Sequence, residues 1–450
     1  MRLATGLLTF PLVVGCLIGD DPSETQANFI SGTRDAFGIG DSSGVGRFGA
    51  FNDSLGTNGR SCNTCHLEDQ GWTITPKGVQ ARFDATNGTD PIFRKNDGSN
   101  CDVNIDTSST SARSAAYSML RTKGLIRVSM PVPVGADFTL IAVDDPYRCA
   151  SAAKVSLFRR PLPSTNLRFL STLMWDGRES KFDVAGDLHT FNLPAGLGQQ
   201  AIDATLGHAQ ATFTRSSDMA SIVNFEDGIH TAQVFDDDAG DLDQNGAHGG
   251  LFTLANVNFF YGINDPLGLN PTGAPFNPRA FTLYDAWKFS HNSAQQQIFR
   301  GQEIFNTKPI VITGVKGLND SFNLPTINGT CTTCHDTPQV GNHSLSLAID
   351  IGLTDVNRRT SDMPLYTFRE NSTGAQVKTT DPGRAMITGK FADIGKFKGA
   401  ILRGLSLRAP YFHNGSAATL ADAVQFYNQR FLINFTNQER TDLVAFLSAL

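Results

Sequence analysis

Two short motifs of this 450-residue chain combine cysteine and histidine at a spacing that can hold a cofactor. They are CNTCH at 62–66 and CTTCH at 331–335. C-x-x-C-H is the attachment motif of c-type haem, in which two thiols bond the porphyrin edge and the histidine ligates iron from one face. Paired zinc half-sites normally lie much closer together, and a thioredoxin-like motif lacks the histidine. The sequence therefore predicts two covalent haems.

Each predicted haem has two attachment cysteines and one proximal histidine. The residues are Cys62, Cys65 and His66 for the first haem and Cys331, Cys334 and His335 for the second. The opposite face of each iron decides the function. Strong ligands on both faces give an electron carrier, whereas an open face can bind peroxide or dioxygen.

The other cysteines indicate an oxidising compartment. Cys101 and Cys149 are left over from the haem motifs, and in an exported protein they predict a disulfide, with two unpaired thiols as the alternative. Residues 1–20 have the basic, then apolar, pattern of an export signal. VVGC at 13–16 resembles a lipobox, in which Cys16 would be acylated; a simple secretory signal is the alternative. We expect a periplasmic protein whose one membrane attachment is this N-terminal lipid.

The positions of the motifs predict how the chain is divided. Helices best enclose a flat apolar macrocycle, so the expected fold class is mainly α, with two cytochrome c-like haem domains and long irregular loops. The first domain should span 28–235, with an insertion at 73–160. An acidic, glycine-rich linker at 236–250 leads to the second domain at 251–450. The net charge of -6 and the absence of a basic patch argue against nucleic acid as a partner.

Two capping boxes predict the last helices of the chain. Thr419 with Asp422 precedes one apolar-periodic run, and Thr436 with Glu439 precedes the next. Tyr427 lies on the apolar face of the first helix and should point into the second domain.

Two further stretches carry a family resemblance. FKGAILRGLSLRAPYFHNGSAATLADAVQFY at 397–427 is similar to the C-terminal signature of bacterial di-haem cytochrome c peroxidases. LMWDGRE at 173–179 is similar to that family's motif between the haems. With both haem motifs, the resemblance spans most of 45–450. It implies a peroxide-reactive N-terminal haem and an electron-transfer C-terminal haem.

The resemblance also implies a sixth ligand for the second haem. That position holds methionine in the peroxidases and tyrosine in the related enzymes that mature methylamine dehydrogenase; here it is Tyr427. A core aromatic is the alternative, and Met363 and Met386 are rival ligands away from the family position. His413 matches the family's turn histidine and is expected to be structural.

Around the first haem, the chain departs from the family. The peroxidases carry a blocking distal histidine before the Trp-Asp-Gly-Arg motif, and this chain has no histidine between His66 and His189. Residues 199–211 resemble the segment that supplies Gln and Glu to the peroxide pocket. Gln200 fits the Gln, and the Glu position falls near His208 or Gln210, of which His208 has a pKa range suited to proton transfer. A structural histidine is the alternative.

Of two further features of the family, a tryptophan between the haems has a match in this chain, and a calcium site has only a partial match. Trp175 matches the tryptophan between the haems and is expected to relay electrons, unless it is only a core aromatic. The family also binds calcium between its domains. Pro410 matches one carbonyl donor, but 160–161 is Arg-Pro where an asparagine is expected, so the resemblance supports calcium only in part.

The favoured interpretation is a periplasmic oxidoreductase that reduces hydrogen peroxide to water. Its electrons would come from a small periplasmic cytochrome c or cupredoxin. One alternative is an oxidase that uses peroxide or dioxygen to oxidise an organic or protein substrate, which Tyr427 and the missing histidine favour. A second alternative is a non-catalytic electron carrier.

Overall fold

The computed structural model describes residues 28–35, 38–39 and 49–450. The predicted export signal and the lipobox cysteine Cys16 lie outside the described residues and remain predictions. No helix within the described part of the chain is long and apolar enough to cross a bilayer.

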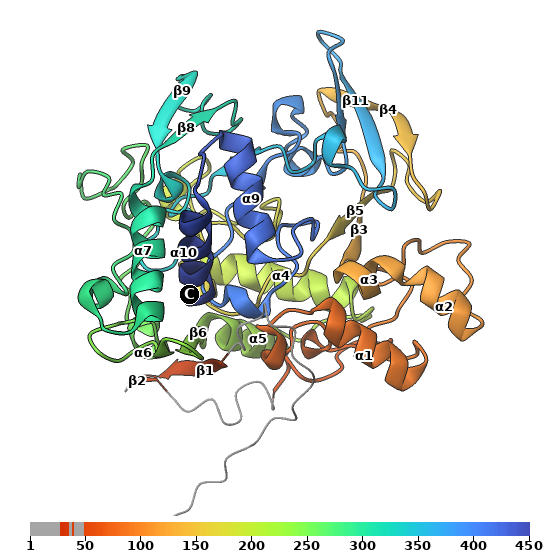
Figure 1. Ribbon diagram of the computed structural model, residues 1–450. Coiled ribbons are helices and arrows are strands. Elements are labelled where there is room, and N and C mark those ends of the chain that lie inside the picture. The colour runs from red at the N-terminus through yellow and green to blue at the C-terminus, as the bar shows by residue number, and fades with distance from the viewer. Residues whose placement is uncertain (1–27, 36–37, 40–48) are drawn as a thin grey trace, which may run out of the picture.

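Three helices form the core of the C-terminal half. They are α7 (Ser293–Thr307), α9 (Leu420–Phe431) and α10 (Asn437–Ser448), and α10 packs against both of the others (Figure 1). Both predicted capping boxes are confirmed, at Thr419 for α9 and at Thr436 for α10. Residues of the predicted linker join this core, because Ala239, Leu242 and Ala247 are buried in it.

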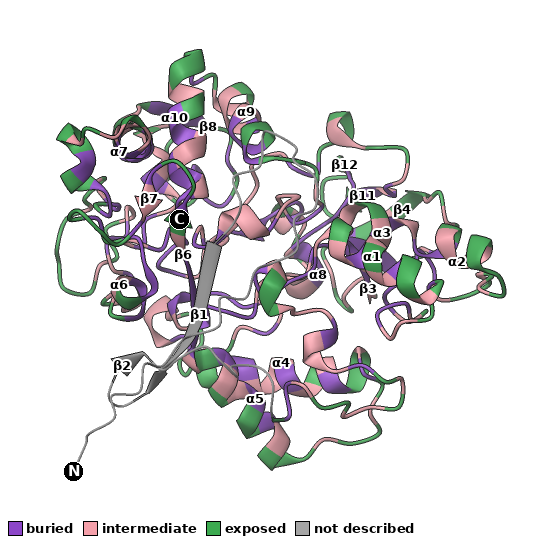
Figure 2. Ribbon diagram, turned by 60° about the horizontal axis from the view of Figure 1, so that its bottom comes forward, coloured by how far each residue is buried: buried purple, intermediate pink, exposed green. Residues whose placement is uncertain are grey.

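The N-terminal half packs helices around one antiparallel strand pair. β1 (Asn28–Asp35) pairs with β6 (Ile229–Asp236), which joins the two ends of the first predicted domain. β6 runs through the interior and is buried along most of its length (Figure 2). The helices α4 (Leu193–Gly207) and α5 (Ser216–Gly228) pack against each other in this half.

The 73–160 segment contains regular structure rather than irregular loops. Its elements are α1 (Pro76–Thr86), α2 (Thr110–Ala116), α3 (Ser118–Lys123), β3 (Ile126–Met130), β4 (Phe138–Asp144) and β5 (Val155–Arg159). β3 pairs with β5, and the predicted Cys101–Cys149 disulfide is confirmed, with 5.6 Å between the Cα atoms. The disulfide closes the segment on itself.

A three-stranded sheet joins the two halves of the chain. β4 pairs antiparallel with β11 (Leu365–Glu370), which in turn pairs with β12 (Gln376–Thr379). The expectation of a mainly α fold is therefore right only in part. Helices form the core of the C-terminal half, but the β4–β11 pairing joins two short segments more than 200 residues apart, which no local pattern reveals.

The remaining elements are short. They are β2 (Gly38–Ile39), β7 (Gly240–Asp241), α6 (Leu251–Ala255), β8 (Ile310–Thr313), β9 (Thr326–Gly329), β10 (Ala348–Ile349), α8 (Ala385–Thr388) and β13 (Phe397–Lys398).

Buried ion pairs tie the end of β5 to both halves. The Arg159 guanidinium donates from Nε to Asp381 at 2.7 Å and from Nη1 to Asp176 at 2.5 Å. All three residues are buried, and a buried charge is tolerated only when it is paired in this way. Asp176 follows Trp175 directly, so these pairs also fix the position of that indole.

Candidate active site

Two cavities lie side by side in the structure, one at each C-x-x-C-H motif. The first cavity, of about 170 Å³, is lined by Cys62, Cys65 and His66. The second cavity, of about 250 Å³, is lined by the corresponding residues of the second motif. The two cavities share a wall, because Arg160, Trp175, Lys398 and Arg408, among others, line both.

Both motifs have the same local structure. Each begins with a 3-10 turn, at Cys62–Thr64 and at Cys331–Thr333, and each turn is closed by a capping box. The amide of each motif histidine donates to the carbonyl of its first cysteine, at 3.1 Å for His66 and 3.2 Å for His335. This turn brings two thiols and one imidazole to the same cavity. None of these four cysteines forms a disulfide.

The imidazoles of both motifs are held in the form that ligates iron. His66 Nδ1 lies 3.0 Å from the carbonyl oxygen of Trp72, and His335 Nδ1 lies 2.5 Å from that of Gly341. A carbonyl only accepts, so Nδ1 carries the proton and Nε2 keeps its lone pair. Burial lowers the pKa of His66 to about 4 and also lowers that of His335. Both imidazoles are therefore neutral at pH 7.

The cavity walls contain buried donors that no protein acceptor satisfies. Among the described residues, these donors are Arg408 Nε and Nη2, His343 Nε2 and the one ring nitrogen of neutral His413 that carries the proton, and none of them has a hydrogen-bond partner. Unpaired buried donors are costly, especially on a guanidinium. The carboxylates of a haem would satisfy them. The thiols, the neutral imidazoles and these donors thus fit one covalent haem in each cavity.

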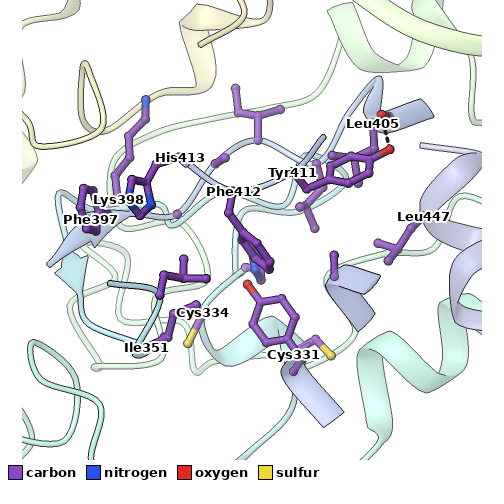
Figure 3. A pocket seen from close by; sticks show the side chains of 18 of the residues that line it. Cys331, Cys334, Ile351, Phe397, Lys398, Leu405, Tyr411, Phe412, His413 and Leu447 are labelled. Atoms are coloured by element: carbon purple, nitrogen blue, oxygen red, sulfur yellow. Dashed lines mark hydrogen bonds between the residues drawn. The ribbon is translucent and has the colours of Figure 1, made fainter. Parts of the chain in front are cut away.

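Tyr427 lies inside the second cavity, on α9. Tyr427 lines this cavity together with Cys331 and Cys334, and burial, followed by these two thiols, raises the pKa of Tyr427. No partner for this hydroxyl occurs within residues 49–450, whereas the Tyr411 hydroxyl donates to the Leu405 carbonyl at 2.9 Å (Figure 3). Tyr427 is thus available to bind a group in the cavity.

The other candidate ligands of the second haem are placed differently. Met363 and Met386 are buried in two separate apolar clusters and line neither cavity. His413 lines the second cavity, but its ring stacks on Phe397 with 4.0 Å between centroids (Figure 3). Its backbone carbonyl also accepts from the Arg160 amide at 2.6 Å, which anchors the turn.

The first cavity brings together the residues predicted from the 199–211 segment. Gln200, on α4, and His208, at the C-terminal end of this helix, both line it. Sequence reasoning missed the partner of His208, which is Asp97: its carboxylate accepts from His208 Nδ1 and from the Arg60 guanidinium. Asp97 precedes His208 by 111 residues and belongs to no local motif, so no sequence signal pointed to it.

Glu226 is a second residue of the first cavity that sequence reasoning missed. Burial raises the pKa of Glu226 to about 8, and among the described residues its Oε2 has no partner. A signal existed, because Glu226 continues the buried stripe of Met219 and Ile222 on α5. A carboxyl group on an otherwise apolar helix face is a reason to look for a site.

Trp175 lies in the wall between the cavities in a fixed orientation. Its indole Nε1 donates to the Arg160 carbonyl at 2.8 Å, and its own carbonyl accepts from the Lys398 amide at 3.0 Å. Met174, which precedes it, has a φ of 61°, a strained value for this residue type. Such strain is maintained only where the surroundings determine the backbone.

The region of the predicted calcium site holds a cation of the chain itself. The buried Arg160 guanidinium donates to the backbone carbonyls of Lys123 and Arg408, each at 3.2 Å. Arg408 lies two residues before Pro410, the expected calcium ligand. Calcium binding here stays an untested prediction.

Comparison with known proteins shows relatives among cytochrome c peroxidases. A cytochrome c peroxidase of Denitromonas iodatirespirans is 32% identical over 151 residues, which cover 29% of this chain and 38% of that protein. The cytochrome c551 peroxidase of Nitrosomonas europaea is 34% identical over 122 residues, or 27% of this chain and 30% of that protein. The chain thus spans about a third of these relatives. They show that part of this chain is similar in sequence to cytochrome c peroxidases.

The other comparisons add little. No family model matches the chain. A solved structure described as a MauG-like protein associated with microbial copper homeostasis aligns with 97% of this chain and 95% of its own, at 16% identity and a TM-score of 0.39. A likeness at that level bears on neither fold nor function.

The attachment residues predict the haem content of variants. Replacing Cys331 and Cys334 with alanine should lower covalent haem from two per chain to one, because no thioether can form at the second motif. Covalent haem is measured by the pyridine haemochrome assay together with the intact mass. Replacing Cys101 and Cys149 with serine is the matched control and should leave both haems in place. Two covalent haems in the alanine variant would contradict the assignment.

Proposed function

We propose that this protein is a periplasmic di-haem c-type peroxidase that reduces hydrogen peroxide to water. The observation that carries the proposal is the pair of haem-type cavities with Trp175 in their common wall and His208 in the first. Two covalent haems suit the task, since peroxide takes two electrons and small redox proteins deliver one each. The partial sequence similarity to cytochrome c peroxidases supports the same activity.

In this proposal the residues of the first cavity handle protons. When bound, the first haem supplies the iron that binds and reduces peroxide. His208 takes the proton from one peroxide oxygen and returns it to the other, which leaves as water. The Gln200 amide lies on the same helix and orients the substrate by hydrogen bonding.

The second cavity provides the entry for electrons. A haem held there by Cys331, Cys334 and His335 would supply one-electron chemistry toward a small periplasmic cytochrome c or cupredoxin, and Trp175 would lie between it and the first haem. The net charge of -6 favours a basic donor through long-range attraction. Residues 1–20 direct export in this proposal, and Cys16 carries a lipid that holds the protein at a membrane surface.

Tyr427 is the proposed sixth ligand of the second haem. Its side chain lines the second cavity together with the attachment thiols, and its hydroxyl has no partner among residues 49–450. An anionic oxygen ligand stabilises ferric iron, whereas methionine would raise the reduction potential.

An oxidase that acts on an organic or protein substrate is the second candidate function. It is favoured by Tyr427 and by the lack of any histidine between His66 and His189, because a first haem without a blocking ligand needs no prior reduction. A non-catalytic electron carrier is the weakest candidate. It requires a strong protein ligand on the open face of the first haem.

Peroxide should react at once with the fully oxidised protein. Rapid mixing of the diferric, haem-loaded protein with hydrogen peroxide should change its absorption spectrum within milliseconds. His208→Gln should slow this change by about 100-fold, the usual contribution of a general base. If the spectrum changes only after one-electron reduction, the protein is a gated peroxidase and the oxidase candidate loses its support.

Tyr427→Phe should change the second haem alone. Loss of an oxygen ligand should raise the reduction potential of that haem and alter its ferric electron paramagnetic resonance signal. Redox titration and the resonance spectrum test this. Tyr411→Phe is the matched control, because the Tyr411 hydroxyl is already bonded to the Leu405 carbonyl. An unchanged signal in Tyr427→Phe would show that Tyr427 is only a core aromatic.

A further inference from the structure

We propose that Asp97 is a positioning residue that fixes His208 for proton transfer, so that the disulfide-closed 73–160 segment forms part of the peroxide site. This inference rests on the proposed function. It gives that segment a role that neither the haem motifs nor the family signatures assign to it.

The contact between Asp97 and His208 joins the 73–160 segment to the C-terminal end of α4. One carboxylate oxygen of Asp97 accepts from His208 Nδ1, and the other accepts from Nη1 of Arg60. Asp97 is 6% exposed and Arg60 is 3% exposed, while the His208 side chain is 42% exposed. All three residues line the first cavity. The imidazole is therefore held by a buried anion at its inner nitrogen.

This arrangement determines the tautomer of His208. An ionised carboxylate can only accept, so the Nδ1 of a neutral His208 must carry the proton. Nε2 then keeps its lone pair, which is the form that a general base needs. The backbone of His208 is fixed as well, because its carbonyl accepts a hydrogen bond from the side-chain amide of Asn58 at 2.8 Å.

Arg60 keeps the Asp97 carboxylate ionised and fixes its orientation. Its Nε donates to the Pro91 carbonyl at 2.8 Å and its Nη2 to the Ile92 carbonyl at 2.6 Å, so its direction is set by backbone. Burial raises the pKa of Asp97, but Arg60 and His208 outweigh this effect and leave the pKa below its ordinary value. Asp97 is thus a carboxylate throughout the neutral range.

The rest of the segment holds the Asp97 loop in place. The Arg127 amide, on β3, donates to the Asp97 carbonyl at 2.7 Å. Arg127 Nη2 lies 2.9 Å from the Asp102 carboxylate, beside the Cys101–Cys149 disulfide. The disulfide, the strand and the loop therefore form one support for the carboxylate.

Asp97→Asn tests the role with little change in shape. Arg60 can only donate, so the amide oxygen of the asparagine must face Arg60 and its NH₂ must face His208. His208 Nδ1 would then accept, and its proton would move to Nε2, which abolishes the base. The measurements are the rate constant for peroxide and the association rate of cyanide, since hydrogen cyanide must also lose its proton to bind iron.

The expected order of both rates is wild type, then Asp97→Glu, then Asp97→Asn equal to His208→Gln, with a loss of about 100-fold in the last two. The double variant should be no slower than either single variant. Asp106→Asn, which removes an exposed carboxylate from the same loop outside the cavity and its support, should keep wild-type rates. Wild-type rates in Asp97→Asn, or losses that multiply in the double variant, would overturn the proposal.

Two other outcomes also decide whether Asp97 positions His208. If Asp97→Asn does not load both haems, Asp97→Glu carries the test alone: about tenfold slower cyanide binding supports the role, and an unchanged rate overturns it. If the wild-type protein does not react with peroxide but its cyanide association rate falls in the Asp97 variants, the positioning role stands and the peroxidase proposal fails.

Discussion

The arrangement of the whole site depends on two consecutive buried arginines, Arg159 and Arg160. Arg159 is paired with Asp176 and Asp381, and so joins a strand of the N-terminal half to the C-terminal half. The Arg160 guanidinium donates to the carbonyl of Arg408, and the Arg160 backbone carbonyl accepts a hydrogen bond from the indole Nε1 of Trp175. Because a buried guanidinium is stable only when its partners stay in place, these contacts fix the wall that the two cavities share.

The cavities on either side of that wall differ in their chemistry. The first is lined by His208, Asp97 and Arg60, which can hold and move protons. The second is lined mainly by apolar and aromatic side chains, with Tyr427 near the attachment thiols. An environment with a proton carrier suits bond cleavage in peroxide, and an apolar one suits electron transfer, which needs little rearrangement. The division of labour proposed for the two haems follows from this difference.

The sequence predicted those features whose determinants are local. The C-x-x-C-H turns and the capping boxes at Thr419 and Thr436 each depend on a few neighbouring residues of known geometry. The Cys101–Cys149 disulfide is not local, but it could be predicted because these two cysteines are left over from the haem motifs. The β4–β11 pairing could not be predicted, because strand partners more than 200 residues apart leave no periodic signal. Asp97 was missed for the same reason, since the fold alone brings it to His208.

The central claim is that Trp175, in the shared wall, connects the two haem sites. The most direct measurement starts with the second haem reduced and the first oxidised, adds peroxide, and follows oxidation of the second haem on the millisecond scale in wild type and in Trp175→Phe. Trp287→Phe is the matched control, because Trp287 is buried in the C-terminal core and lines neither cavity. Our account predicts that oxidation slows by about tenfold or more in Trp175→Phe, a barrier increase of about 1.4 kcal/mol, and is unchanged in the control. Equal rates in Trp175→Phe and wild type would contradict it.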